Sequence, residues 1–137
     1  MTGRKAGKAV HPNRILLDTH TLVWALSDPN SLSRAARGAL DGGEFIASVA
    51  SLWELLIKRR RPGALLADPV PWWERYVVRS GIPVIAIRQP HVAMLGELAD
   101  HHRDPFDRIL VAQAMVEKAA LVSKDESLAV YGVRVIW

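Results

Sequence analysis

The sequence predicts an α/β fold in which helices cover both faces of a parallel sheet. Short apolar runs alternate with segments of helical pattern along the 137 residues. The apolar runs, such as residues 15–17 and 82–87, lack regular polar alternation, which is typical of parallel strands buried on both faces. Half of the residues are hydrophobic, and this length is enough for one domain with its own core.

Proline and glycine residues divide the chain into its expected elements, in runs too short to link separate domains. The expected strands are residues 14–17, 44–47, 82–87, 120–123 and 133–137. The expected helices are residues 19–27 and 33–40, one from the second strand to about residue 60, then 71–79, 90–99, 105–118 and a short one at 126–131. In parallel sheets of this kind, functional sites form beyond the carboxyl ends of the strands.

Individual elements are supported by their end signals and faces. The first strand runs into Asp18, a residue type that often caps a following helix. The basic run 58–61 precedes Pro62 and Gly63, as expected of cations at a helix C-terminus, although a contact with a phosphate backbone is a second interpretation. The helix after Pro105 repeats apolar residues at the spacing of a face packed on the sheet.

Four acidic residues lie at the edges of apolar runs. Asp18 and Asp125 follow the first and fourth expected strands, and Glu54 and Asp107 lie near the starts of helices. Acidic groups at apolar margins are costly to desolvate unless something compensates their charge. Converging carboxylates need a cation between them, and hard oxygen ligands suit Mg²⁺ or Mn²⁺. If the fold brings these residues together, the sequence predicts a metal-dependent enzyme that cleaves phosphodiester bonds.

Each acid also has a structural interpretation. Asp18 and Asp125 are placed to cap the helices that follow them. Ser51 and Glu54 match a capping box, unless that helix already begins near Ser48. These interpretations remain open for each residue taken singly.

Two aspartates three residues apart compete for one role. Pro105 fits the first position of a helix, which makes Asp104 its N-cap. Asp107 then heads the apolar face and points towards the strand ends. We therefore predict that Asp104 caps the helix and that Asp107 is the metal ligand.

Composition limits the other classes of protein. The absence of cysteine excludes disulfides and thiolate metal sites and fits the cytoplasm. No apolar stretch has the length of a signal peptide or a membrane span, so we expect no membrane attachment. The net charge of +4 comes largely from residues 1–13, which we expect to be a basic, disordered tail before a single nuclease domain at residues 14–137. The high charge is therefore weak evidence for nucleic-acid binding.

Six motifs, in their order and spacing, resemble those of PIN-domain ribonucleases and, within them, VapC-type toxins of prokaryotic toxin–antitoxin pairs. The match covers residues 14–137. Ser123 stands where the family often has threonine, and both residues carry a hydroxyl group. The motifs are Leu17-Asp18-Thr19-His20-Thr21-Leu22-Val23-Trp24, Ala50-Ser51-Leu52-Trp53-Glu54-Leu55, His102-Arg103-Asp104-Pro105-Phe106-Asp107-Arg108, Val111-Ala112-Gln113-Ala114, Leu121-Val122-Ser123-Lys124-Asp125 and Tyr131-Gly132-Val133.

The resemblance implies a PIN-like three-layer fold with a central five-stranded parallel sheet. It implies endonucleolytic cleavage of RNA by metal-assisted hydrolysis with Mg²⁺ or Mn²⁺. Glu54 is then a metal ligand or the residue that orients the attacking water, and Thr19 and Ser123 supply hydroxyl groups behind the ligands. The resemblance also implies a homodimer and a small VapB-like antitoxin as partner. The expected direct or water-mediated ligands are Asp18, Asp107 and Asp125.

Some residues near these motifs have two interpretations. Arg108 is placed to contact a substrate phosphate or to form a surface ion pair. Residues 100–102 echo the Asp-His-His signature of another phosphoesterase class, but they follow a helix and not a strand. We therefore interpret His101 and His102 as a polar helix terminus near the rim of the site.

Two other functions are alternatives to a nuclease. A receiver-like signalling module needs adjacent acids after the first strand, an acceptor aspartate after the third and a lysine after the last, and this chain lacks all three. A catalytically silent module that binds RNA or protein stays possible from the sequence, although all four acids are present. The apolar surplus at Trp24 and at Trp72 and Trp73 suggests a surface for a dimer mate or antitoxin, with self-packing as the alternative.

Overall fold

The computed structural model describes residues 14–137, so the predicted tail at residues 1–13 lies outside the described residues. Five parallel strands form one sheet, in the order β4-β3-β2-β5-β6. This confirms the predicted five-stranded parallel sheet. The strands are β2 (Arg14–Leu17), β3 (Glu44–Ser48), β4 (Val84–Ile85), β5 (Ala120–Val122) and β6 (Val135–Ile136).

The first strand of the sheet in the sequence, β2, lies at its centre. From β2 the chain adds β3 and β4 on one side, then crosses to add β5 and β6 on the other. Leu16 pairs with Ile46 of β3 on one side, and Leu17 pairs with Val122 of β5 on the other. The order therefore reverses beside β2, and a reversal of this kind leaves a crevice at the carboxyl ends of the strands.

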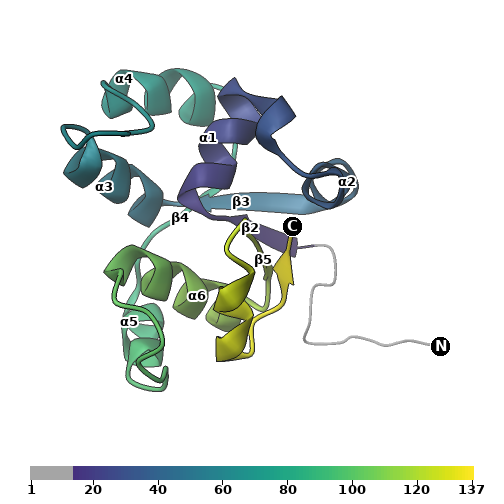
Figure 1. Ribbon diagram of the computed structural model, residues 1–137, viewed down its shortest axis with the longest axis vertical. Coiled ribbons are helices and arrows are strands. Elements are labelled where there is room, and N and C mark those ends of the chain that lie inside the picture. Colours follow the sequence, from purple (N-terminus) through teal and green to yellow (C-terminus); the bar gives the residue numbers. More distant parts are fainter. Residues whose placement is uncertain (1–13) are drawn as a thin grey trace.

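Helices cover both faces of the sheet, as predicted (Figure 1). The helices α1, α2 and α4 pack on one face, and α5 and α6 on the other. Helix α3 leaves the carboxyl end of β3 and contacts α1, α4 and α6. None of the described helices is long and apolar enough to cross a membrane. The α-helices are α1 (Thr19–Ser27), α2 (Arg34–Gly42), α3 (Val49–Lys58), α4 (Pro69–Trp73), α5 (Gln89–Leu95) and α6 (Pro105–Glu117), and the shorter turns are the 3₁₀ helices η1 (Pro29–Ser31) and η3 (Glu126–Tyr131) and the π-helix η2 (Glu74–Val78).

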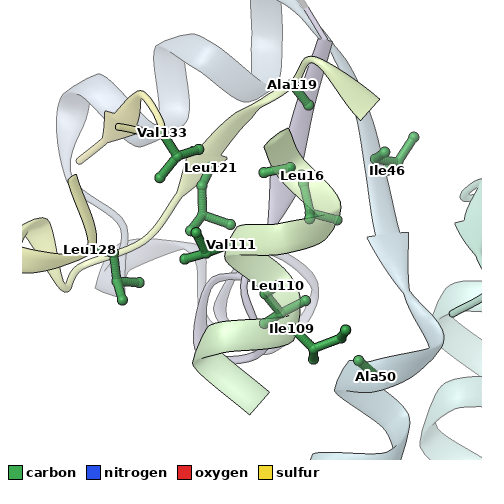
Figure 2. Close-up of a cluster of buried hydrophobic side chains, with 11 residues drawn as sticks. Leu16, Ile46, Ala50, Ile109, Leu110, Val111, Ala119, Leu121, Leu128 and Val133 are labelled. Carbon is green, nitrogen blue, oxygen red and sulfur yellow. The ribbon is translucent and has the colours of Figure 1, made fainter. Parts of the chain in front are cut away.

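The sheet separates two apolar clusters because neighbouring side chains of a strand point to opposite faces. In β2, Ile15 and Leu17 belong to the cluster under α1, α2 and α4, whereas Leu16 belongs to the cluster under α6. Figure 2 shows Leu16 and Leu121 of the sheet facing Leu110 and Val111 of α6. Both faces of the central strands are therefore buried, which explains their uninterrupted apolar sequences.

Several element boundaries differ from the prediction. Strand β4 spans two residues and not 82–87, because Pro83 has no N–H group and the carbonyl of Ala86 accepts a hydrogen bond from Gln113 Nε2 and not from a strand. Strand β6 is likewise shorter than 133–137. The helix expected at 71–79 begins at Pro69 and continues as a π-helical turn from Glu74.

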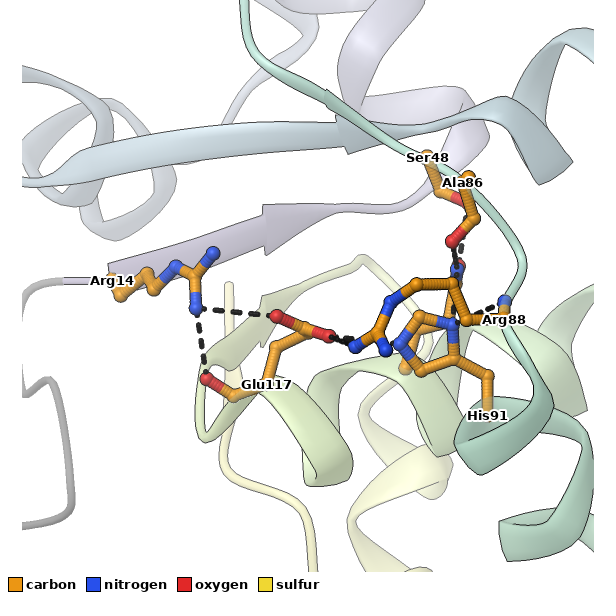
Figure 3. A network of polar contacts seen from close by, with 7 residues as sticks. Arg14, Ser48, Ala86, Arg88, His91 and Glu117 are labelled. Carbon is orange, nitrogen blue, oxygen red and sulfur yellow. Dashed lines mark hydrogen bonds and ion pairs between the residues drawn. The ribbon is translucent and has the colours of Figure 1, made fainter.

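A partly buried polar network ties α5 and α6 to the amino end of the sheet (Figure 3). Glu117, at the end of α6, accepts hydrogen bonds from Arg14 and Arg88 and lies 2.8 Å from Nε2 of the fully buried His91. His91 and then Arg88 and Arg14 lower the pKa of Glu117, against the effect of its partial burial. Its charge therefore stabilises the fold above the ordinary glutamate pKa, and this contribution is lost as the pH falls through the lowered value.

We expect Glu117→Gln to destabilise the protein at pH 7 by about 1–3 kcal/mol, because charge-assisted hydrogen bonds are lost around a buried histidine. The variant should also lose less stability than the native chain on acidification below about pH 4.5, since one carboxylate no longer titrates. Urea unfolding at several pH values measures both effects. Glu97→Gln is the matched control, because Glu97 is exposed. Equal unfolding free energies for the two variants would contradict the role of this network.

Candidate active site

Asp18 lies at the junction between β2, β5 and α1. Its backbone N–H donates to the carbonyl of Val122 at 3.1 Å, which holds it at the carboxyl end of the sheet. Its Oδ1 accepts from the N–H of Thr21 at 2.9 Å, so it caps α1 as one of its interpretations predicted. Within residues 14–137 its Oδ2 accepts no hydrogen bond. The cap therefore uses one oxygen and leaves the other for a further partner.

Asp107 occupies the first turn of α6, and its pKa is the most strongly shifted in the site. Its pKa is raised to about 7, first by burial and then by the negative charges of Asp104, Glu54 and Asp18, with only Lys58 opposing them. A carboxylate in this position is stabilised by a proton or by a cation. This is the physical signature of a site that binds positive charge.

Asp104 is the N-cap of α6, as predicted. Its Oδ1 accepts from the N–H of Phe106 at 2.8 Å, and its Oδ2 accepts from Lys58 Nζ at 2.9 Å. Although burial acts to raise its pKa, these two hydrogen bonds lower it. Both oxygens of Asp104 are thus engaged, and Asp104 differs from Asp107 in having a cation of its own.

Glu54 lies in the second turn of α3, because that helix begins after the N-cap Ser48 and not at Ser51. The capping-box interpretation is therefore wrong, since Ser48 Oγ already accepts from the N–H of Ala50. Glu54 Oε1 accepts from the hydroxyl of Thr19, and its Oε2 accepts from Lys58 Nζ at 2.7 Å. Glu54 is 5 % exposed, so its charge is compensated inside the protein by a hydroxyl group and an ammonium group.

Lys58 joins the two compensated acids. Its ammonium group donates to Glu54 and Asp104 and lies 5.6 Å from the centre of the Phe106 ring. These hydrogen bonds raise the pKa of Lys58 against the opposing effect of burial. The sequence predicted Lys58 only as a cation at the end of a helix, whereas in the structure it also pairs with these two acids. The spacing of four residues from Glu54 was the signal in the sequence that could have identified the pair.

Asp125 follows β5 and caps the 3₁₀ helix η3. Its Oδ1 accepts from the N–H of Ser127 at 3.1 Å and from the Ser127 hydroxyl, and its side chain is 48 % exposed. Its own N–H donates to Ser123 Oγ at 3.1 Å. Ser123 is fully buried, so its hydroxyl fixes the backbone that carries Asp125.

These residues border two adjoining hollows. The larger has a volume of about 480 Å³ and contains three of the four predicted acids. Glu54 borders a smaller hollow of about 120 Å³ together with Thr19 and Lys58, and His20 lines both. Sequence reasoning did not single out His20 or Lys124, for which the only signal was their adjacency to the predicted residues. The larger hollow is lined by Asp18, His20, Trp24, Asp107, Ser123, Lys124 and Asp125.

Three aspartates line the larger hollow, but their carboxylates do not converge on a single point. Among residues 14–137, no group of three or more histidine, aspartate or glutamate side chains is close enough to hold a metal ion. Its three aspartates nevertheless offer only hard oxygen donors, which suit Mg²⁺ or Mn²⁺, and Asp107 has no compensating cation of its own. The donor chemistry fits a divalent cation.

The family model of the PIN domain matches residues 15–133 of this sequence. The chain belongs to the PIN-domain family. Ribonuclease VapC22 of Mycobacterium tuberculosis is 30% identical over 116 residues, which cover 83% of this chain and 88% of that protein. The family match and this relative confirm the sequence-based identification as a PIN-domain nuclease similar to VapC ribonucleases.

Solved structures of toxin–antitoxin complexes share this fold. One is DNA-bound VapBC from Salmonella typhimurium, with a TM-score of 0.65 and 15% identity over 89% of this chain and 96% of that chain. Another is FitAcB from Neisseria gonorrhoeae, with a TM-score of 0.61 and 18% identity over 88% of this chain and 95% of that chain. At these identities the likeness confirms the PIN-like α/β fold.

The pKa of Asp107 predicts how stability depends on pH. Because the folded pKa is about 7 and an unfolded aspartate has an ordinary pKa near 3.9, the folded chain holds the extra proton between these values. The free energy of unfolding should therefore fall as the pH rises from about 4 to about 7. In EDTA, Asp107→Asn should unfold at a higher temperature than the native chain at about pH 8, and the difference should vanish near pH 4.

Thermal unfolding followed by circular dichroism measures this difference. Asp104→Asn is the control with the opposite sign, because Asp104 has a lowered pKa and a partner in Lys58. A lower melting temperature for Asp107→Asn at pH 8 would contradict the unpaired charge of Asp107.

Proposed function

We propose that this protein is a Mg²⁺- or Mn²⁺-dependent endoribonuclease that acts as the toxin of a type II toxin–antitoxin pair. Its metal ligands, direct or through water, are Asp18, Asp107 and Asp125. The observation that supports this most is the pKa of Asp107, which burial and three neighbouring carboxylates raise to about 7 beside an open hollow.

The divalent cation would activate a water molecule and neutralise charge on the scissile phosphate. The chain itself supplies the walls and the order of the site. Asp18 is fixed by its hydrogen bond to Thr21, and Ser123 fixes the backbone of Asp125. These contacts hold the acidic side chains before substrate arrives, as catalysis by positioning requires.

Glu54 has a role distinct from the three aspartates in this proposal. Its two oxygens are occupied by Thr19 and Lys58, and it borders the smaller hollow. We therefore place Glu54 among the residues that orient the site, through the Thr19 hydroxyl next to Asp18. This role differs from the two predicted from the sequence, which were a metal ligand and the residue that orients the attacking water.

The proposal includes partners and a location. VapBC and FitAcB complexes are the structural neighbours of this chain, and by analogy we propose a small VapB-like antitoxin that inhibits the enzyme in the cytoplasm. The substrate is RNA, as the name of the mycobacterial relative indicates for that protein.

A homodimer would use the outer face of α3. Val49, Trp53 and Ile57 recur every four residues along this helix and are 37%, 53% and 52% exposed, so they form one apolar stripe. Of the three tryptophans suggested by the sequence, Trp24 lines the larger hollow, and the other two are less suitable than this stripe. Trp73 is only 6% exposed in the core, and Trp72 donates a hydrogen bond to Ser27 Oγ.

Asp107→Asn should reduce RNA cleavage by at least about 100-fold, because even residues behind a metal ligand contribute 10–100-fold. Asp104→Asn is the matched control on the same helical turn. It should keep activity within a few-fold, since asparagine caps a helix about as well as aspartate. Cleavage of a defined single-stranded RNA with Mn²⁺ or with EDTA measures both variants.

Cleavage that persists in EDTA would contradict the metal requirement, and a larger loss in Asp104→Asn would exchange the two assignments. Binding of RNA without cleavage by the native chain in Mg²⁺ and in Mn²⁺ would favour the silent RNA-binding module.

Trp53→Glu should weaken the dimer by about 2 kcal/mol, or roughly 30-fold in Kd, because a central tryptophan is replaced by a charge. Light scattering coupled to size exclusion measures the mass as a function of concentration. Val130→Glu is the control, since Val130 is 55% exposed but lies on η3. A native protein that is monomeric at all concentrations would contradict the dimer.

A further inference from the structure

A chain of hydrogen bonds ends on the carboxylate of Asp125. Arg108 Nη1 lies 3.3 Å from Tyr131 Oη, which lies 3.0 Å from His102 Nδ1. His102 Nε2 lies 2.9 Å from Ser127 Oγ, and the Ser127 hydroxyl donates to Asp125 Oδ1. The five residues come from α6, η3, the segment between α5 and α6, and the turn after β5.

When His102 is neutral, the two ends of this chain of hydrogen bonds fix the direction of every bond in it. A guanidinium group can only donate, and an ionised carboxylate can only accept. Tyr131 therefore accepts from Arg108 and donates to Nδ1 of His102, which leaves the imidazole proton on Nε2. Ser127 then accepts from Nε2 and donates to Asp125. Donors aligned in this way polarise and strengthen one another.

Arg108 is held in place for this role by the segment before α6. Its Nη1 also donates to the carbonyl of Ala99 at 2.8 Å, and its Nη2 lies 3.7 Å from the carboxylate of Asp100. The ion-pair interpretation of Arg108 is therefore the one observed, and its donors are directed into the protein. His102, interpreted from the sequence as a polar helix terminus, is only 18% exposed and lies inside the chain of hydrogen bonds.

Asp125 needs such support more than the other acids do. Its side chain is 48% exposed and follows a three-residue strand, so little packing restricts its rotation. The hydrogen bonds from Ser127 hold Oδ1, whereas Oδ2 accepts no hydrogen bond within residues 14–137 and lies 3.8 Å from Nε2 of His102. The carboxylate is thus fixed by one oxygen while the other remains available to a cation.

We infer that His102 and Ser127 are positioning residues that orient Asp125 for the divalent cation, with Tyr131 and Arg108 setting the hydrogen-bond direction. This inference rests on the proposed function, in which Asp125 is a metal ligand. Supporting residues of this kind raise ligand order, and their loss typically weakens metal affinity by 10–100-fold.

Mn²⁺ affinity of the purified full-length protein, measured by calorimetric titration without RNA, tests the inference. Ser127→Ala and His102→Ala should each raise the Kd for Mn²⁺ by about 10–100-fold. Ser127→Thr keeps the hydroxyl and should restore the Kd to within about threefold of the native value. His101→Ala is the matched control, because His101 packs on the Tyr131 ring but makes no side-chain hydrogen bond among residues 14–137.

The double variant His102→Ala, Ser127→Ala should bind Mn²⁺ about as weakly as either single variant, because both break the same chain. Multiplicative effects, or Kd values for the two single variants equal to that of His101→Ala, would overturn the inference. Asp125→Asn separates this failure from failure of the proposed function. If Asp125→Asn binds Mn²⁺ as the native chain does, Asp125 is not a ligand and both proposals are overturned, whereas weak binding by Asp125→Asn alone overturns only the positioning role.

Discussion

The crowding of carboxylates around the partly buried Asp107 is the constraint on which the site depends. The order of the strands brings the carboxyl ends of β2 and β5 together, and α6 begins beside them. Burial and three neighbouring carboxylates, those of Asp104, Glu54 and Asp18, then raise the pKa of Asp107 to about 7. The ammonium group of Lys58 compensates Glu54 and Asp104 inside the protein. In the proposed function, a divalent cation from solution compensates Asp18, Asp107 and Asp125.

Local structure and site chemistry use the same residues. Asp18, Asp104 and Asp125 are all N-caps, and each accepts its backbone hydrogen bond with Oδ1. What distinguishes them is the second oxygen. In Asp104 it accepts from Lys58, whereas within residues 14–137 it accepts no hydrogen bond in Asp18 or Asp125, and that of Asp125 lies 3.8 Å from Nε2 of His102. Capping and metal binding were therefore never alternatives for Asp18 and Asp125. A cap fixes the carboxylate's orientation, and a fixed orientation favours ligation.

The sequence was sufficient for the sheet and for most of the helices, because buried parallel strands and capped helices have strong local signals. The assignment of Asp104 as a cap followed from Pro105 alone. The early start of α3 was less visible, because Ser48 and Ser51 both suit an N-cap and only the end of β3 decides between them. The short β4 depends on a hydrogen bond from Gln113, which is distant in sequence.

Parts of the site could not be predicted from local sequence patterns. Lys58 was read as one of four basic residues at a helix end, and only the fold shows that Asp104 is its second partner. The link between His102 and Asp125 joins segments that are adjacent only after η3 packs beside α6. The sequence predicted that Trp72 and Trp73 could not both face one core but not which of them is buried, and the structure places Trp73 in the core. These contacts require the tertiary structure.

A crystal structure of the protein soaked in Mn²⁺, with anomalous diffraction recorded at the manganese edge, tests the central claim most directly. Manganese scatters anomalously, so its position is determined independently of any assumption about the ligands. We expect an anomalous peak in the larger hollow, coordinated by oxygens of Asp18 and Asp107 and by Asp125 directly or through water. A manganese ion elsewhere, or none in the hollow with Asp107 still lacking a cation, would contradict the account.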